Sequence, residues 1–215
     1  QSQKPLIARF DLTGNLDTTF GTNGYINPII SNFDNAIDIF IQNDSKILVT
    51  GRTTNSFIVT RFLNNGNLDT TFGTNGISNI DLGANGISVP NSIIVQSDNK
   101  ILVSGTLNIN NSNVFNYAVT RLNENGSLDT TFANNGIYKT MVGISPSGSC
   151  TDMKLLSNGK IILAGNLKSG NGIGLLRLNS NGTLDNTFGT NGLTTTINNN
   201  ITNVSVSKIA IKPDG

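Results

Sequence analysis

The chain has 215 residues, and its 14 lysines and arginines nearly balance its 13 aspartates and glutamates, giving a formal net charge of +1. Nucleic acids and anionic membranes attract clustered positive charge, so neither is an expected partner. The absence of histidine excludes Ser-His-Asp triads, Cys-His pairs and histidine-bound metals. No apolar run approaches the roughly 18 to 20 residues of a spanning helix, so no direct membrane insertion is expected.

The N-terminal residues 1–30 contain one predicted strand, at residues 6–10, followed by a polar loop that ends in Asn23-Gly24. No basic and apolar signal segment stands before this strand. Asparagine makes up roughly one residue in six and lysine and glutamate are few, a departure from average usage that is typical of exported bacterial surface proteins. We therefore expect Gln1 to follow a removed signal peptide, and the protein to be secreted or at the bacterial cell surface.

The next residues, 31–86, predict four strands and no helix. Residues 36–41 alternate as in a strand with one face in a core, and further strands are expected at residues 46–50, 57–62 and 77–80. Asparagine, glycine and threonine, which are abundant throughout, are poor helix formers and good turn formers. Asn65-Gly66 is the pair favoured where both central residues of a hairpin turn have positive φ.

The rest of the chain repeats this pattern. The motif Leu-Asp-x-Thr-Phe-(Gly/Ala)-x-Asn-Gly recurs at intervals of about 52 to 60 residues, with an arginine eight positions before each aspartate. Its four copies lie at residues 16–24, 68–76, 128–136 and 184–192. A second marker, Lys-Ile-(Leu/Ile)-(Val/Leu)-x-Gly, lies at residues 46–51, 100–105 and 160–165.

Four short strands in each tandem repeat predict an all-β protein, a β-propeller of four-stranded antiparallel blades. One such sheet cannot bury both of its faces, whereas stacked blades bury each face against a neighbour. A β-solenoid is the alternative, although its rungs are usually shorter. The expected units of the single region 1–215 are a partial blade at 1–30, blades at 31–86, 87–143 and 144–200, and the start of a further blade at 201–215.

The last unit resembles the start of residues 31–86 but lacks its second strand. We therefore expect an incomplete part of a larger propeller in a longer protein. A four-bladed ring is the alternative.

The pattern Arg-(Phe/Leu)-x-x-x-Gly-x-Leu-Asp-x-Thr-Phe-(Gly/Ala)-x-x-Gly resembles the delta-60 repeat, and its four copies cover nearly the whole chain. This bacterial repeat family is grouped with β-propellers and occurs in large secreted or surface-attached proteins. The resemblance implies a propeller of unassigned function, and it supplies no catalytic, metal-binding or cofactor-binding residues, so none are assigned. Among the four copies, Ala133 stands in place of the usual glycine and Asn186 in place of the threonine after the aspartate, and neither change alters the predicted fold.

Each repeat carries an arginine, an aspartate and a phenylalanine to which we assign structural roles. The twelve residues are Arg9, Asp17, Phe20, Arg61, Asp69, Phe72, Arg121, Asp129, Phe132, Arg177, Asp185 and Phe188. The aspartate is expected to accept backbone N–H groups in an Asx-turn, and the phenylalanine to fill the space between blades. A bidentate Arg–Asp pair within or between blades would cross-link the repeats.

Other interpretations of these repeated residues remain open. The aspartates could form a calcium-binding or catalytic ring, although calcium loops need several oxygen ligands and each loop here has one carboxylate. The arginines could form a basic binding ring. Lys46, Lys100 and Lys160 are expected to be solvated.

The tripeptide Asp-Thr-Thr also resembles an O-glycosylation signal of exported bacterial proteins. Thr18, Thr70 and Thr130 are therefore candidate attachment sites, and Asn186 breaks the signal in the fourth copy.

Residues 106–116 are an insertion in the repeat and are expected to form a long rim loop. Its asparagines, with Phe115 and Tyr117 nearby, suit a sugar or a protein surface, or the segment is a tolerated surface loop. Residues 198–200 form a similar polar loop. Cys150, the single cysteine, is expected to be a small buried residue.

These features favour a non-catalytic propeller module of a larger exported bacterial cell-surface protein. It would serve as a structural spacer, an adhesin segment or a platform that binds other domains of the same chain and protein partners. A carbohydrate-binding lectin with one pocket per blade is the alternative, with a glycan as partner. A glycan-processing enzyme is less favoured, because it needs paired carboxylates. The acids outside the repeat, Asp11, Asp34, Asp38, Asp81, Asp152 and Glu124, show no convergence in the sequence.

Overall fold

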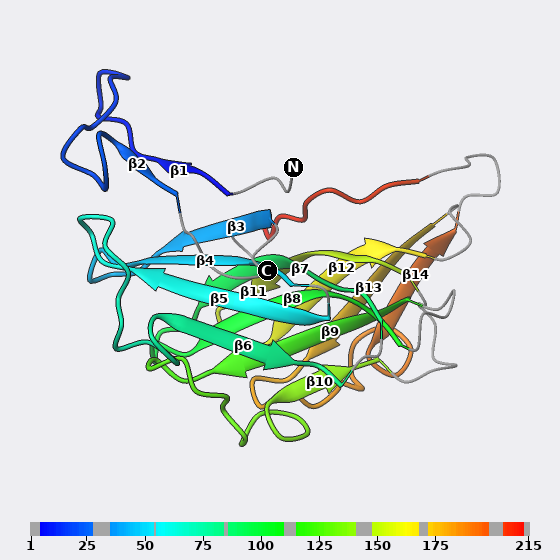
Figure 1. Cartoon of the computed structure of the whole chain (residues 1–215). Helices are drawn as coiled ribbons and strands as arrows, with labels where there is room; N and C mark the ends of the chain where they lie inside the picture. The colour runs from blue at the N-terminus through cyan, green and yellow to red at the C-terminus, as the bar shows by residue number, and fades with distance from the viewer. Residues whose placement is uncertain are drawn as a thin grey trace.

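The computed structural model describes residues 5–27, 35–53, 55–83, 86–109, 115–140, 148–167, 172–197 and 204–212. These ranges consist of strands, turns and extended segments, with no helix among them. They accordingly hold no helix that could cross a membrane. Figure 1 shows three large twisted sheets stacked one behind another, with a small two-stranded ribbon beside the first.

Each large sheet contains four antiparallel strands that pair in the order in which they follow along the chain. The first sheet contains β3 (Asn35–Ile41), β4 (Ile47–Arg52), β5 (Ser56–Phe62) and β6 (Ile77–Asp81). The second contains β7 (Ser88–Val95), β8 (Ile101–Asn108), β9 (Phe115–Leu122) and β10 (Ile137–Lys139). The third contains β11 (Cys150–Leu155), β12 (Ile161–Asn166), β13 (Gly172–Leu178) and β14 (Leu193–Ile197). The predicted all-β fold of four-stranded antiparallel blades is confirmed, and the described strands form part of a propeller without a closed ring.

The first repeat contributes a shorter unit than predicted. Its strand β1 (Ile7–Ala8) pairs with β2 (Tyr25–Ile26) and ends before the expected limit at residue 10. Phe10 instead forms an isolated bridge with Leu16, which closes the intervening turn.

Two kinds of Asn-Gly turn occur in each of the second, third and fourth repeats, and only one has the predicted conformation. Asn75 and Gly76 both have positive φ, 51° and 87°, as a two-residue hairpin turn requires. At Asn65-Gly66 only the glycine has positive φ, and its N–H donates to the carbonyl of Leu63. The prediction of two positive φ values at Asn65-Gly66 is therefore wrong. The turn is instead a tight turn followed by a left-handed glycine, which is the longer type of hairpin loop.

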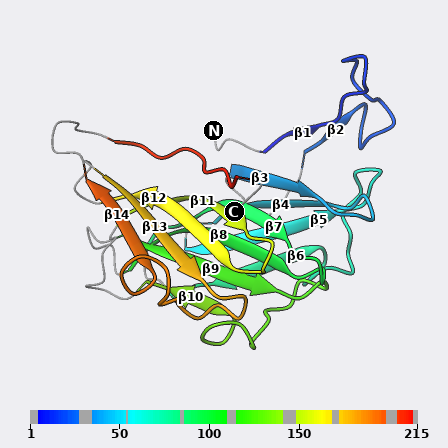
Figure 2. The same ribbon diagram turned by 180° about the vertical axis from the view of Figure 1, so that it is seen from behind.

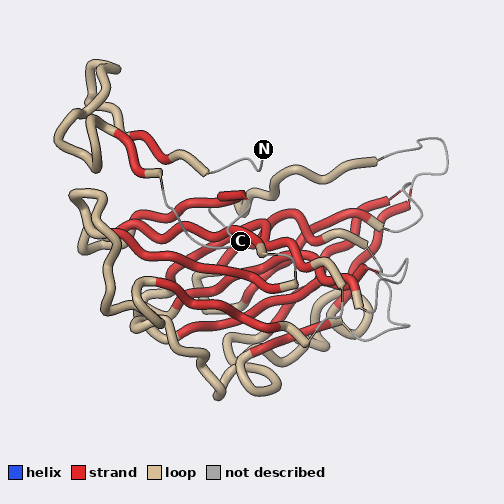
Figure 3. Tube along the Cα trace, viewed as in Figure 1, coloured by secondary structure: helices blue, strands red, loops and turns tan. Residues whose placement is uncertain are grey.

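The core lies between neighbouring sheets. One cluster joins Phe57, Val59 and Phe72 of the second repeat to Ile93 and Val103 of the third, and all of them are buried. Figure 3 shows the strands filling the middle of the stack while the loops lie at its ends. Each sheet carries apolar side chains on both faces. Stacking therefore buries apolar surface that a single sheet would expose to water.

The strand β3 is an exception, since its predicted buried face is not buried. Ile39 is 50% exposed, whereas the equivalent Ile93 of β7 is 3% exposed. The reason is the neighbour: β7 packs against β3, β4 and β5, but among the described residues β3 has only the short β1–β2 ribbon on that side.

Candidate functional site

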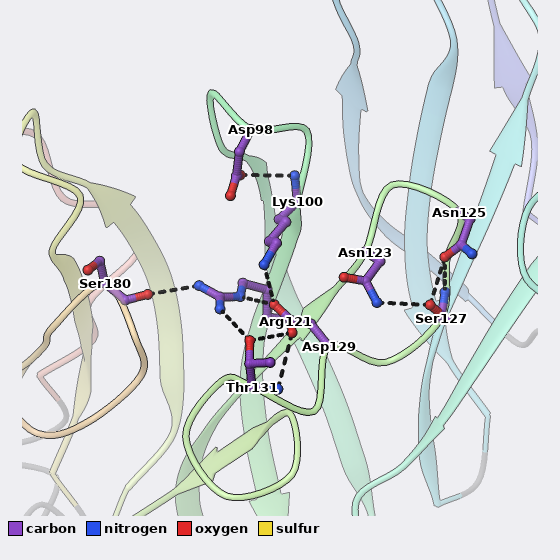
Figure 4. A network of polar contacts seen from close by, with 9 residues as sticks. All are labelled: Asp98, Lys100, Arg121, Asn123, Asn125, Ser127, Asp129, Thr131 and Ser180. Atoms are coloured by element: carbon purple, nitrogen blue, oxygen red, sulfur yellow. Dashed lines mark hydrogen bonds and ion pairs between the residues drawn. The ribbon is translucent and has the colours of Figure 1, made fainter.

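A polar network recurs in every repeat and is shown for the third repeat in Figure 4. Arg121 Nε donates to Asp129 Oδ2 at 2.7 Å, and Arg121 Nη1 donates to the carbonyl of Ser180 in the next repeat at 2.8 Å. The other carboxylate oxygen, Oδ1 of Asp129, accepts the backbone N–H and the hydroxyl of Thr131 at 3.1 and 2.6 Å. The arginine therefore uses one N–H on the aspartate and another on the next repeat, and the expected bidentate pair does not form.

The remaining repeats show the same ion pair within the repeat. The Nε–Oδ2 distances are 2.8 Å for Arg9–Asp17, 2.7 Å for Arg61–Asp69 and 2.6 Å for Arg177–Asp185. In each case the threonine two positions after the aspartate donates its N–H to Oδ1, which is an Asx-turn. The contacts among the motif residues thus hold the loop of each repeat in its conformation.

The phenylalanine of each motif lies under its arginine, and Phe72 and Phe132 also lie under the turn glycine of the next repeat. The guanidinium carbon is 4.5 to 4.7 Å from the ring centroid in all four copies, close enough for a cation–π contact. The Phe72 ring is fully buried, and a Cβ added to Gly126 of the next repeat would lie 2.8 Å from it. Glycine at that turn therefore allows the close approach of the two repeats.

The expectation that the repeated lysines are solvated is wrong. Lys100 Nζ and Lys160 Nζ each lie 2.8 Å from the aspartate of their own repeat, while Lys46 Nζ is 3.9 Å from Asp69. The strand register explains this contact. Ile101 pairs with Leu122, so the lysine before Ile101 lies beside the loop that follows Leu122.

The network keeps these carboxylates ionised. Burial opposes the charge of Asp129, but hydrogen bonds from Lys100, Thr131 and Arg121 hold its pKa well below the usual range. For Asp185, hydrogen bonds from Lys160 and Thr187 have the same effect on the pKa. Both oxygens of each carboxylate already have donors, and the described residues contain no group of three acidic or thiol side chains placed to hold a metal ion.

The candidate glycosylation residues lie on the surface of this loop. Thr18, Thr70 and Thr130 are exposed, whereas the threonine that follows each donates its hydroxyl to the aspartate. Two adjacent threonines thus have different environments, and the modification itself stays a prediction.

A second set of equivalent positions, which no repeated residue type marks in the sequence, lies on the first strand of each large sheet. These strands, β3, β7 and β11, are called the innermost strands below. Asp38, Ser92 and Asp152 each follow a β-bulge, and Lys208 occupies the corresponding place in residues 204–212. Asp38 Oδ2 accepts the N–H of Ile93, and Asp152 Oδ2 accepts the N–H of Ile209, both at 2.9 Å. The aspartates therefore link each inner strand to the next segment. Their signal in the sequence is a position eight residues before the repeated lysine.

Charged neighbours surround Asp152 in particular. Its carboxylate lies 3.2 Å from Lys154 Nζ and 3.3 Å from Lys208 Nζ. Burial opposes ionisation of Asp152, but the Ile209 N–H and the lysines hold its pKa below the usual range. The other acids outside the repeat act locally: Asp11 accepts the N–H groups of Thr13 and Asn15.

The remaining acids show no site of their own. Asp81 accepts the N–H of Gly83, and Glu124 is exposed. Asp34 lies outside the described residues.

Two grooves occupy equivalent places between neighbouring repeats. One, of about 560 Å³, lies between β6 and the turn that contains Gly126. The other, of about 530 Å³, lies between β10 and the turn that contains Gly182. Hydroxyl and amide groups line both, including Asn79 and Ser127 in the first and Asn134 in the second.

The expected rim loop at residues 106–116 is shorter than predicted, because β8 continues to Asn108 and β9 begins at Phe115. Tyr117 is fully buried and donates its hydroxyl to the carbonyl of Gly174, so it cannot contact a partner. Residues 110–114, like residues 198–200, lie outside the described residues. Cys150 is a free, buried thiol, and burial raises its pKa to about 12.

Three segments of the chain, residues 42–72, 96–132 and 156–188, match a family described as a β-propeller domain of unknown function (DUF5122). Each segment runs from the turn before the second strand to the phenylalanine of the motif, so the matches follow the repeat. The chain is a repeat-type β-propeller. No curated protein matches the sequence of this propeller.

Proposed function

We propose that this β-propeller is a non-catalytic module of a larger exported protein of a bacterial cell surface, built from delta-60 repeats. In this role it is a structural spacer, an adhesin segment or a platform for partner proteins. The observation that carries the proposal is that the recurring polar groups are engaged inside the molecule. Arginine, aspartate and threonine of every copy bind one another, so the repeat serves the fold.

The acids on the innermost strands support the same proposal. Asp38 and Asp152 accept backbone N–H groups, and Asp152 has a lowered pKa because of the Ile209 N–H and its lysine neighbours, which outweigh its burial. A general acid at neutral pH needs a raised pKa. The Asp152 carboxylate is thus better suited to linking neighbouring segments of the fold than to protonating a glycosidic oxygen.

The test is the location of the protein on intact cells of its source. A membrane-impermeant amine-reactive biotin should label it before lysis, with a cytosolic protein as the unlabelled control. Labelling only after lysis would reject the proposal. Peptides that contain Thr18, Thr70 or Thr130 should then be weighed: sugar-sized mass increments there, and none at Asn186, would show that the protein passes through a glycosylating export pathway.

The two inter-repeat grooves favour glycan binding as the second candidate function. Equivalent pockets lined by hydroxyl and amide groups suit a neutral sugar. A glycan array probed with the protein tests this. A double variant, Ser127→Trp and Thr183→Trp, fills both grooves and should abolish binding, whereas Thr70→Trp, on the exposed loop, should not.

A further inference from the structure

The turn that follows β9 holds a small network of asparagine and serine side chains. Asn125 Oδ1 accepts the backbone N–H of Ser127 at 3.0 Å and its hydroxyl at 2.7 Å. Asn123 Nδ2 donates to the same hydroxyl oxygen at 2.9 Å, as Figure 4 shows. A serine hydroxyl has a single proton. Because its oxygen accepts the hydrogen bond from Asn123, that proton is the one donated to Asn125.

The turn that follows β13 holds the same network. Asn181 Oδ1 accepts the N–H and the hydroxyl of Thr183 at 3.0 and 2.7 Å. Asn179 Nδ2 donates to that hydroxyl oxygen at 3.0 Å. Asn125 and Asn181 are both exposed, and the Nδ2 group of each has no hydrogen-bond partner among the described residues. In both turns the carbonyl end of the side-chain amide is therefore engaged within the turn, and its nitrogen end is not.

Both turns are held in place by their backbone while the asparagine side chain stays exposed. Figure 2 shows the loops that follow β9 and β13 at the ends of the strands. The backbone carbonyl of Asn125 accepts the N–H of Gly73 at 2.7 Å, and that of Asn181 accepts the N–H of Ala133 at 2.8 Å. Each turn is thus fixed against the preceding repeat, and each presents one amide nitrogen at the surface.

The residues of these turns match the pattern Asn-x-(Ser/Thr), in which x is not proline. The matching segments are residues 125–127 and 181–183. In exported proteins this pattern marks asparagines of surface loops that accept N-linked sugars. Residues 43–45 match it too, but their geometry differs, because the N–H of Ser45 donates to the backbone carbonyl of Gln42 at 2.9 Å. The structure therefore distinguishes two of these segments from a third that the sequence pattern alone does not separate.

We propose that Asn125 and Asn181 are attachment sites for N-linked sugars, with a glycosyl diphosphate as the donor. Nδ2 bonds to the anomeric carbon, the bond from that carbon to the diphosphate oxygen breaks, and the diphosphate leaves with the electron pair. A base of the transferase that catalyses the step takes one proton from Nδ2. The two donors on Oδ1 stabilise the negative charge that this oxygen gains as Nδ2 loses its proton. The inference rests on the proposed export, because this modification belongs to secreted chains.

The second repeat contains an internal control for the hydroxyl. Asn65 is exposed and is followed by a glycine, and its Oδ1 accepts the N–H of Asn67 at 3.0 Å. This turn therefore has the backbone and the Asx-turn of the other two, but residue 67 is asparagine and supplies no hydroxyl. Asn65 should carry no sugar, and Asn67→Ser should bring a sugar to it.

Mass spectrometry of the protein isolated from its own source tests the proposal. Peptides that contain Asn125 or Asn181 should carry sugar-sized mass increments, and electron-transfer fragmentation should place these increments on the asparagine. The increments should withstand mild alkaline β-elimination, which removes O-linked sugars and so separates this modification from one at Thr130. The peptide that contains Asn65 should show no increment on that residue.

Two variants produced in the same source give the decisive result. Ser127→Ala keeps the backbone N–H on Asn125 Oδ1 but removes the hydroxyl, so Asn125 should lose its sugar while Asn181 of the same chain keeps it. Asn67→Ser should show the opposite change, a sugar gained at Asn65.

Three results would overturn the proposal. One is a chain that is labelled on intact cells but carries no sugar at Asn125 and Asn181, and this result would leave the proposed export standing. Another is a sugar at Asn125 that persists after Ser127→Ala. The third is an Asn65 that is modified in the wild type or stays bare after Asn67→Ser.

Discussion

The inner repeats and the end repeats carry the same motif in different surroundings. The arginine side chain is 5% exposed in the second repeat and 9% in the third, but 31% in the first and 22% in the fourth. All four copies nevertheless keep the Arg–Asp ion pair and the Asx-turn. The local loop is therefore a property of the motif, whereas its burial depends on the neighbouring repeats.

The largest effect should come from removing an inner arginine. Arg121→Ala leaves the buried Asp129 with less compensation and breaks the contact with Ser180, so we expect a loss of about 3 to 5 kcal/mol in the free energy of unfolding. Urea titrations followed by circular dichroism measure it. Arg9→Ala removes the exposed equivalent, and its loss should be much smaller because solvent screens that pair. Equal losses would mean that burial does not set the strength of the contact.

A smaller difference should separate two turn glycines. Gly126→Ala places a Cβ 2.8 Å from the Phe72 ring at a φ of +84°. Backbone strain and the clash together should lower the free energy of unfolding by about 2 to 4 kcal/mol. Gly14→Ala has a φ of +85° and open space, so only the strain of about 1 to 2 kcal/mol remains. Thermal unfolding of both variants at a low protein concentration gives the difference. If the two midpoints fell equally, the contact between repeats would contribute nothing.

Structural features that depend on residues repeated in every copy could be predicted from the sequence, whereas features at positions that vary between copies could not. The arginine, aspartate and phenylalanine stand at fixed spacing in four copies, so the repeated unit and its Asx-turn could be predicted from them. The inner-strand position holds Asp38, Ser92, Asp152 or Lys208 and gives no repeated residue type.

Tertiary contacts explain the other misses. The lysine contacts depend on the register of β8 against β9, and the exposure of β3 depends on which strands lie beside it. Neither the lysine contacts nor the exposure of β3 can be predicted from a local sequence pattern.

Acid should weaken the inner repeats through their buried aspartates. Burial opposes ionisation of Asp69 and Asp129, but hydrogen bonds from Thr71 and from Lys100 and Thr131, respectively, lower both pKa values. An aspartate in the unfolded chain has a pKa of about 3.9. As the pH falls toward and below that value, the unfolded state therefore binds more protons than the folded state. The stabilisation should be complete above about pH 5 and should be lost progressively toward lower pH.

Urea titrations between about pH 3 and pH 6 measure this dependence. Asp129→Asn removes one of the depressed pKa values, so its stability should vary less with pH than that of the wild type. An unchanged slope would mean that other carboxylates account for the loss.

The smallest expected effect concerns the lysines that contact the motif aspartates. Lys100 Nζ lies 2.8 Å from Asp129, whereas Lys46 Nζ lies 3.9 Å from Asp69 and 2.9 Å from the more exposed Asp44. Lys100→Met keeps most of the side-chain length and removes the charge. It should lower the free energy of unfolding by about 1 kcal/mol or less, because Lys100 is partly exposed. Lys46→Met should cost still less. Both losses should shrink in about 1 M salt, where the screening length falls to about 3 Å. A loss that is unchanged by salt would assign the stabilisation to packing of the lysine stem along the strand and not to the ion pair.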